Sequence, residues 1–145
     1  MYKDYFSLFK LDLQFSIDIQ TLEKNYVALQ RNHHPDLFSL QSEKRLASEI
    51  IAKVNKAYQI LKSPIKRAEY LLEIKGITIN KNDINNIIEE IFTIKEEKNI
   101  NVQHQILSCM KAIENAFSIE DFNEAAIQVI RYKYLSKIQE DRSIT

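Results

Sequence analysis

The chain contains very little glycine and proline. It has one glycine, Gly76, and two prolines among 145 residues. Phosphate-binding loops, dinucleotide-binding fingerprints and nucleophile elbows need glycines for close backbone approach or for a positive φ angle. The sequence therefore argues against nucleotide-binding enzymes of these classes. Because the same scarcity leaves few turn signals for a many-stranded protein, we predict an all-α fold.

Cysteine, net charge and long apolar segments are scarce as well. The single cysteine, Cys109, excludes an internal disulfide bond. The 20 basic and 20 acidic residues give a formal net charge of zero, so no global field favours nucleic acid or an anionic membrane as a partner. The apolar runs are far shorter than a membrane span, and the first residues are charged where a signal peptide would be apolar. We therefore expect a cytoplasmic protein.

The residues that are present favour helices in the first half of the chain. Apolar residues make up 45% of the sequence, which is enough for a core, and many recur at helical spacing. Asp18 is placed to cap a helix that ends just before the first proline, and a long helix is expected over roughly residues 40–62. Ser63 and Pro64 favour the start of another helix, which is expected to end near Gly76.

The second half carries three further helical patterns, between residues 83 and 140. One face of the first is marked by Ile84, Ile87, Ile91 and Ile94. Ser118 is expected to cap the third helix. Because short connections favour antiparallel neighbours, these helices are predicted to form a three-helix bundle. Residues 76–82 are polar or β-branched and are interpreted as a linker.

The string His34-Pro35-Asp36 stands between two amphipathic helices. Proline fixes its own φ angle and pushes the preceding residue out of the helical region, so the chain has to turn here. We predict an exposed, rigid tip on which Asp36 offers a charge to an arginine of a partner and His34 offers a ring. The alternative is an ordinary turn in which Asp36 caps the next helix. Lys24 and Arg31, seven residues apart on one helix face, either extend this docking surface or are simply solvated.

Surplus apolar residues lie on two of the C-terminal helices. Ile88 and Phe92 lie beside the isoleucine stripe of the first, and Ile127, Ile130 and Tyr134 form a second stripe on the last. One interpretation is that such stripes on neighbouring helices form an exposed patch for a partner. The alternative is that they belong to the core, since a helix in a bundle buries a wide stripe.

A metal site is not expected. The available imidazole and thiol ligands are His33, His34, His104 and Cys109. His104 and Cys109 are five residues apart and do not share a helix face, whereas a structural metal needs three or four convergent ligands. We predict neither a metal nor a cofactor.

Four stretches together resemble a J-domain: Tyr2–Leu11, Leu29–Asp36, Asn55–Tyr58 and Pro64–Leu72. More narrowly, they resemble HscB-type co-chaperones of iron–sulfur cluster assembly, because the string Arg-Ala-Glu-Tyr-Leu-Leu after a proline is characteristic of that branch. The final helix, with Glu-Ala-Ala and Arg-Tyr-Lys-Tyr-Leu-Ser-Lys strings, is also similar. The resemblance weakens at Leu37, where J-domains usually have lysine, and at His33, where they usually have tyrosine.

The resemblance implies a J-domain over residues 1–75 and a C-terminal scaffold-binding domain over residues 83–145. It implies that the tip docks on an HscA- or DnaK-type chaperone and stimulates ATP hydrolysis by that chaperone. It also implies that the C-terminal domain binds and delivers an IscU-type scaffold protein, with no active site in the chain itself. The candidate chaperone-binding residues are Lys24, Arg31, His34, Pro35 and Asp36. The candidate scaffold-binding residues are Ile87, Ile88, Ile91, Phe92 and Tyr134.

Two alternatives are kept. A J-domain protein of another branch would use the same architecture to recruit a different client. A small helical enzyme would require polar residues such as Glu89, Glu90 and His104 to converge in a pocket.

Overall fold

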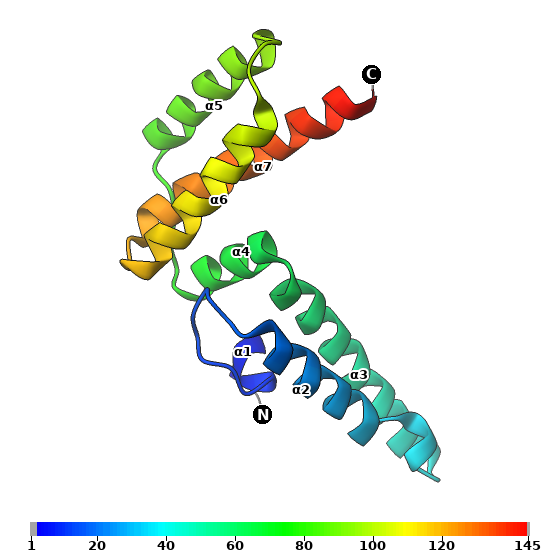
Figure 1. The fold of residues 1–145 in the computed structure, drawn as a ribbon. Coiled ribbons are helices and arrows are strands. Elements are labelled where there is room, and N and C mark those ends of the chain that lie inside the picture. Colours follow the sequence, from blue (N-terminus) through cyan, green and yellow to red (C-terminus); the bar gives the residue numbers. More distant parts are fainter. Residues whose placement is uncertain (1–2, 145) are drawn as a thin grey trace. The chain divides into compact units, whose positions relative to one another are not determined.

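The computed structural model describes residues 3–144, and every regular element in that range is a helix (Figure 1). Tyr2, at the start of the first J-domain-like stretch, lies outside the described residues. The α-helices are α1 (Tyr5–Leu8), α2 (Ile19–Asn32), α3 (Gln41–Lys62), α4 (Pro64–Ile74), α5 (Lys81–Glu96), α6 (Val102–Ser118) and α7 (Phe122–Ile144). A short 3-10 helix, η1 (Pro35–Leu37), lies between α2 and α3. The predicted all-α fold is confirmed.

The chain forms two compact units, Met1–Tyr70 and Leu71–Thr145. The first contains the α2–α3 hairpin with α1, and the second contains the bundle of α5, α6 and α7. The predicted order of a hairpin module followed by a three-helix bundle is therefore confirmed. The division falls within α4, before the predicted boundary at residue 75, and the linker over 76–82 stays a prediction. Within residues 3–144, no helix has the length and apolar character needed to cross a membrane.

In the first unit, α2 pairs with α3 and α1 packs against α3 (Figure 1). Burying a phenylalanine or leucine side chain contributes about 1.5–3 kcal/mol. The buried apolar side chains of this unit include Phe6, Phe9, Phe15, Leu22, Val54, Ala57 and Leu61. Apart from Ala47, those from α3 lie in its C-terminal half, so the loop between α2 and α3 lies at the end of the hairpin away from most of this cluster.

Aromatic rings and polar groups join α2 to α3. The rings of Tyr26 and Tyr58 stack with their centroids 3.9 Å apart. The Tyr26 hydroxyl donates to Asn55 Oδ1 at 2.7 Å, and the Tyr58 hydroxyl donates to Glu23 Oε1 at 2.6 Å. Since these bonds require specific residues to face one another, they hold the two helices in one register.

Arg67 is a buried cation in the first unit. Its Nε donates to the Phe15 carbonyl at 2.7 Å, and its Nη1 donates to the Leu61 carbonyl at 2.6 Å. Its guanidinium carbon also lies 5.0 Å from the centre of the Phe15 ring. A buried charge has to be compensated by hydrogen bonds, and here both acceptors are backbone groups. The arginine therefore fastens the loop before α2 to the end of α3.

Most of the predicted helix boundaries are confirmed by hydrogen bonds at the helix ends. The side chain of Asp18 caps α2, that of Ser63 caps α4, and Gly76 ends α4 with a φ angle of +68°. The predicted cap at Ser118 is wrong, because this residue is the last of α6. Asp121 caps α7 instead, accepting from a backbone amide at 3.2 Å, since the chain needs two more residues to reverse its direction.

In the second unit, α6 and α7 form the most extensive helix pair, and α5 packs on α7 (Figure 1). Their buried side chains include Ile87, Ile91, Ile94, Val102, Ile106, Ile113, Phe117, Val129, Leu135 and Ile138. Two arginines of α7 reach across to the other helices. Arg131 Nη2 lies 2.5 Å from Glu90 Oε1, and Arg142 donates to the carbonyls of Ile94 and Ile100 at 3.0 Å each. These contacts hold the C-terminal half of α5 and the loop after it against α7.

Candidate partner-binding surfaces

The loop that follows α2 carries the string His34-Pro35-Asp36. At the end of α2, the backbone amide of His33 donates to the Leu29 carbonyl at 3.2 Å. His34 has φ −65° and ψ 132°, the extended conformation that a following proline favours. Pro35 then begins η1. The predicted turn is therefore present.

Three hydrogen bonds shape this turn. The backbone amide of Asp36 donates to His34 Nδ1 at 3.1 Å. The amides of Leu37 and Phe38 donate to the carbonyls of His34 and Pro35, at 3.0 and 3.1 Å. Because His34 Nδ1 accepts, the neutral ring carries its proton on Nε2. The imidazole is therefore part of the turn's own scaffold, although 57% of its side chain stays exposed.

The Asp36 side chain extends into solvent, with an exposed fraction of 90%. Its Oδ2 lies 3.5 Å from His34 Nδ1. The carboxylate does not cap the next helix, because α3 begins at Gln41 after Leu40 and has no side-chain cap. This geometry favours the exposed tip over the ordinary capped turn.

Lys24 and Arg31 are both exposed on α2. Neither forms an ion pair with another of the residues 3–144. A spacing of seven residues is close to two helical turns, so the two cations share a face of α2. That face leads toward the tip, and its charges are available to a partner.

The structure separates the candidate scaffold-binding residues into two groups. Ile88, Phe92 and Tyr134 are exposed by 45%, 61% and 40%. Ile87 and Ile91 are buried in the bundle, where they hold α5 in place and cannot contact a partner directly. We therefore restrict the apolar patch to Ile88, Phe92 and Tyr134.

The contacts of Arg131 indicate that these three side chains lie on one side of the bundle. Arg131 bonds to Glu90 on α5 and also to Gln105 on α6, at 3.2 Å, so Glu90 faces the α6 side of α5. Ile88 and Phe92 are each two residues from Glu90, about 160–200° around the helix, and so lie on the side away from α6. On α7, Gln128 contacts Cys109 of α6. Arg131 is three residues after Gln128 and Tyr134 three residues after Arg131, so each step turns about 60° further from α6, toward that same side. The sequence did not predict that Arg131 links α7 to α5 and α6, because the residues next to it on α7 do not indicate which distant side chains it contacts.

The thiol and imidazole groups do not gather into a metal site. Among residues 3–144, no group of three or more histidine, cysteine, aspartate or glutamate side chains is placed to hold a metal ion. Cys109 is buried, and its Sγ donates to the Gln128 carbonyl at 3.0 Å. Burial is the main cause that raises the pKa of this thiol to about 11. Cys109 is therefore a protonated core residue at neutral pH.

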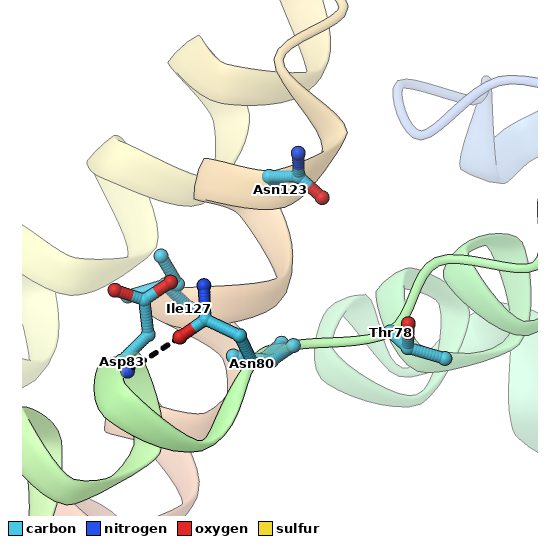
Figure 2. A pocket seen from close by; sticks show the side chains of 6 residues that line it. Thr78, Asn80, Asp83, Asn123 and Ile127 are labelled. Carbon is cyan, nitrogen blue, oxygen red and sulfur yellow. Dashed lines mark hydrogen bonds between the residues drawn. The ribbon is translucent and has the colours of Figure 1, made fainter.

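A small cleft of about 260 Å³ lies where the segment before α5 meets the start of α7 (Figure 2). The residues that line it are Thr78, Ile79, Asn80, Asp83, Asn123 and Ile127. Asn80 Oδ1 accepts from the backbone amide of Asp83 at 2.9 Å, so this amide side chain serves as a helix cap. The lining contains one carboxylate and neither histidine nor lysine. Glu89, Glu90 and His104 are exposed, and none of them lines the cleft, so the helical-enzyme alternative has no support here.

Comparison with known families and proteins agrees with this architecture. The DnaJ domain family matches residues 4–70, and the HSCB C-terminal oligomerisation domain family matches residues 83–142. A co-chaperone protein HscB homolog of Vibrio atlanticus is 32% identical over 160 residues, covering 95% of this chain and 94% of that protein. An HscB homolog of Vibrio cholerae is 46% identical over 79 residues, a match that spans 53% of this chain and 46% of that relative, about half its length.

Two solved structures are similar over nearly the whole chain. Chaperone HscB from Vibrio cholerae has a TM-score of 0.76 at 26% identity, with 95% of each chain covered. The human co-chaperone protein HscB has a TM-score of 0.77 at 29% identity, with 98% of this chain and 81% of the human chain covered. A J-domain followed by a three-helix bundle is thus the class of protein that the fold defines. The chain belongs to the HscB family of co-chaperones.

Proposed function

We propose that this chain is a cytoplasmic adaptor that uses two surfaces in iron–sulfur cluster assembly. The tip at His34-Pro35-Asp36 docks on an HscA- or DnaK-type chaperone and stimulates its ATP hydrolysis. The patch of Ile88, Phe92 and Tyr134 binds an IscU-type scaffold protein and delivers it to that chaperone. The chain contributes binding energy and geometry, while the chaperone performs the hydrolysis.

The observation that carries this proposal is the exposure of the Asp36 carboxylate on a turn that the chain itself holds rigid. Its side chain is 90% exposed, while its own backbone amide is bonded to His34 Nδ1. A carboxylate on a backbone that is already ordered loses less conformational entropy when it pairs with an arginine, and such charge-assisted pairs are strong. Lys24 and Arg31 add positive charge beside it, which favours a partner with an acidic face.

The exposed apolar side chains on α5 and α7 support the second surface. A few aromatic and aliphatic side chains commonly supply most of the free energy of an interface. Phe92 and Tyr134 provide aromatic anchors from two helices that Arg131 and Glu90 hold together.

The test is a single-turnover ATPase assay of the HscA-type chaperone from the same organism, with and without its IscU-type scaffold. Wild-type chain is expected to accelerate hydrolysis, and scaffold is expected to increase the effect. Asp36→Asn should abolish the acceleration. Phe92→Ala should keep the acceleration seen without scaffold and lose the additional effect of scaffold. Failure of the wild-type chain to accelerate hydrolysis by either an HscA- or a DnaK-type chaperone would contradict the proposal.

The alternative of another J-domain branch has a distinct outcome in this assay. The chain would stimulate the chaperone, while the scaffold would neither bind nor add to the rate. Binding of the isolated scaffold, measured by titration calorimetry, separates these two readings.

A further inference from the structure

The start of α3 differs from the start of every other α-helix in residues 3–144. The others begin with a side chain that accepts from a backbone amide of the first turn, namely Asp4, Asp18, Ser63, Asn80, Asn101 and Asp121. At α3 the corresponding residue is Leu40, with φ −82° and ψ 141° and no side-chain cap. Leucine is among the least favourable residues at this position. The helix beside the tip therefore begins without a local stabilisation that the rest of the chain uses.

Leu40 is also exposed, as is Leu37 in the same loop. Their exposed fractions are 62% and 63%. Single exposed leucines are ordinary on protein surfaces. Two exposed leucines within four residues are less ordinary. Leu40 is in addition unfavourable both as an apolar surface residue and as a helix cap. Departures from local rules without a gain in stability are expected mainly at functional sites.

The positions of these leucines relative to Asp36 indicate what covers them. Leu37 follows Asp36 directly, and its amide is bonded to the His34 carbonyl at 3.0 Å, so the turn that holds Asp36 also holds Leu37. Consecutive α-carbons are about 3.8 Å apart, so a protein surface that pairs with Asp36 also reaches Leu37. The loop from His33 to Leu40 contains Asp36 as its one carboxylate and has no lysine or arginine. A complementary partner surface is therefore a basic group surrounded by apolar atoms.

We propose that Leu37 and Leu40 form an apolar anchor that seats in a nonpolar depression of the same chaperone, beside the basic group that pairs with Asp36. This inference rests on the proposed docking function of the tip and specifies the chemistry of the partner's site. Apolar contacts around a charge pair exclude water, which strengthens the pair. Unlike the attraction of Lys24 and Arg31, the leucine contact is not screened by salt.

The test compares Leu37→Ser, Leu40→Ser and the double variant with wild type. The chaperone is the HscA- or DnaK-type protein of the same organism to which the wild-type chain binds. The measurement is the equilibrium affinity of each variant for the ATP-bound form of this chaperone, at low and at high salt. Each substitution is expected to weaken binding about tenfold, which corresponds to 1.4 kcal/mol, and the loss should persist at high salt. The melting temperature of Leu40→Ser should be equal to or above that of wild type, because serine is a good helix cap. Weaker binding by a chain that is at least as stable cannot come from unfolding.

Leu13→Ser is the matched control. Leu13 is an exposed leucine in the loop before α2, and the 14 residues of α2 separate it from the tip by about 21 Å. Its substitution should leave affinity unchanged. Wild-type affinity in the double leucine variant, or an equal loss in Leu13→Ser, would overturn the anchor. Asp36→Asn is measured in parallel and tests the docking function separately. If Asp36→Asn loses ATPase stimulation while the leucine variants keep wild-type affinity, the anchor is rejected and the proposed function stands.

Discussion

At the scale of single residues, His34 and Asp36 do different things in the same turn. His34 Nδ1 accepts a hydrogen bond from the backbone amide of Asp36 at 3.1 Å, so the ring helps to form the turn. The Asp36 carboxylate is 90% exposed and caps no helix. Substitution of Asp36 therefore tests recognition by a partner, whereas substitution of His34 changes both recognition and the turn.

We predict that Asp36→Asn abolishes stimulation of the chaperone's ATPase while changing the free energy of unfolding by less than about 0.5 kcal/mol, because the side chain is exposed. His34→Gln should also abolish stimulation. It is expected to cost about 0.5–1.5 kcal/mol of stability, since the bond to the Asp36 amide is lost or weakened. Urea unfolding and the ATPase assay, performed on the same samples, provide both measurements. Full stimulation by Asp36→Asn would show that the carboxylate is not the docking group.

At the scale of elements, the α2–α3 hairpin is the platform that presents the tip. Stacked tyrosines and interhelical hydrogen bonds, two of which are donated by the tyrosine hydroxyls, fix its register. The hydroxyl of Tyr58 donates to Glu23, and this bond is the main cause that raises the pKa of Tyr58 to about 12, with burial as the second cause. The hairpin therefore has a polar link whose strength depends on pH.

We predict that the hydroxyl of Tyr58 stabilises the fold below pH 10 and loses this effect between pH 10 and pH 12. The unfolded chain releases the proton near the ordinary pKa of 10.0, whereas the folded chain keeps it up to about 12, so stability falls as the pH rises through this range. Tyr58→Phe should be less stable than wild type by about 0.5–1.5 kcal/mol at pH 8. Urea unfolding at pH 8 and pH 11 measures the difference, which should shrink at the higher pH. A constant difference would contradict the assigned hydrogen bond.

We predict that Lys24 and Arg31 accelerate association with the chaperone through long-range attraction. Raising the salt concentration should slow association more than it speeds dissociation, because exposed charges are screened beyond roughly 10 Å at 0.1 M salt. Lys24→Glu with Arg31→Glu should remove most of this salt dependence. Stopped-flow binding over a salt series measures it, with Lys111→Glu on α6 as an exposed control. An association rate that is indifferent to salt in wild type would show that the two cations are merely solvated.

At the scale of the whole molecule, the proposed surfaces lie in different compact units. The tip is in the first unit, and Ile88, Phe92 and Tyr134 are in the second. Each unit has its own buried core. A substitution in one surface is therefore expected to leave binding at the other intact.

We predict that Tyr134→Ala weakens binding of the scaffold roughly thirtyfold or more, because an aromatic anchor is commonly worth 2 kcal/mol or more. ATPase stimulation in the absence of scaffold should not change. Titration calorimetry and thermal melting of one preparation measure affinity and folding together. Leu107→Ala, which removes an exposed leucine from α6, should leave affinity unchanged.

A second control identifies the effect of core damage. Phe117→Ala removes a buried aromatic side chain and should cost about 3–5 kcal/mol of folding stability. If Tyr134→Ala melts as Phe117→Ala does, the tyrosine belongs to the core and the patch assignment fails. Lost affinity with unchanged melting supports the patch.

Features that depend on a few neighbouring residues could be predicted without the structure. The scarcity of glycine and proline predicted the all-α fold, and helical spacing predicted the helices. Asp18, Ser63 and Gly76 marked helix ends correctly, because capping groups and a positive φ angle act within one turn. The turn at His34-Pro35-Asp36 followed from the stereochemistry of proline. Ser118 was misplaced because two possible caps stood three residues apart, at 118 and 121.

Which of these residues are buried, exposed or paired could not be predicted, because it depends on contacts between distant parts of the chain. Arg67 reaches the carbonyl of Phe15, 52 residues away in the sequence, and Arg131 reaches Glu90, 41 residues away. Periodicity placed Ile87 and Ile88 on neighbouring faces of α5 but left open whether α7 covers both. The structure buries the first and exposes the second. The physical reason is that local spacing defines the faces of a helix, whereas its packing partner, through contacts between distant residues, determines which face leaves water.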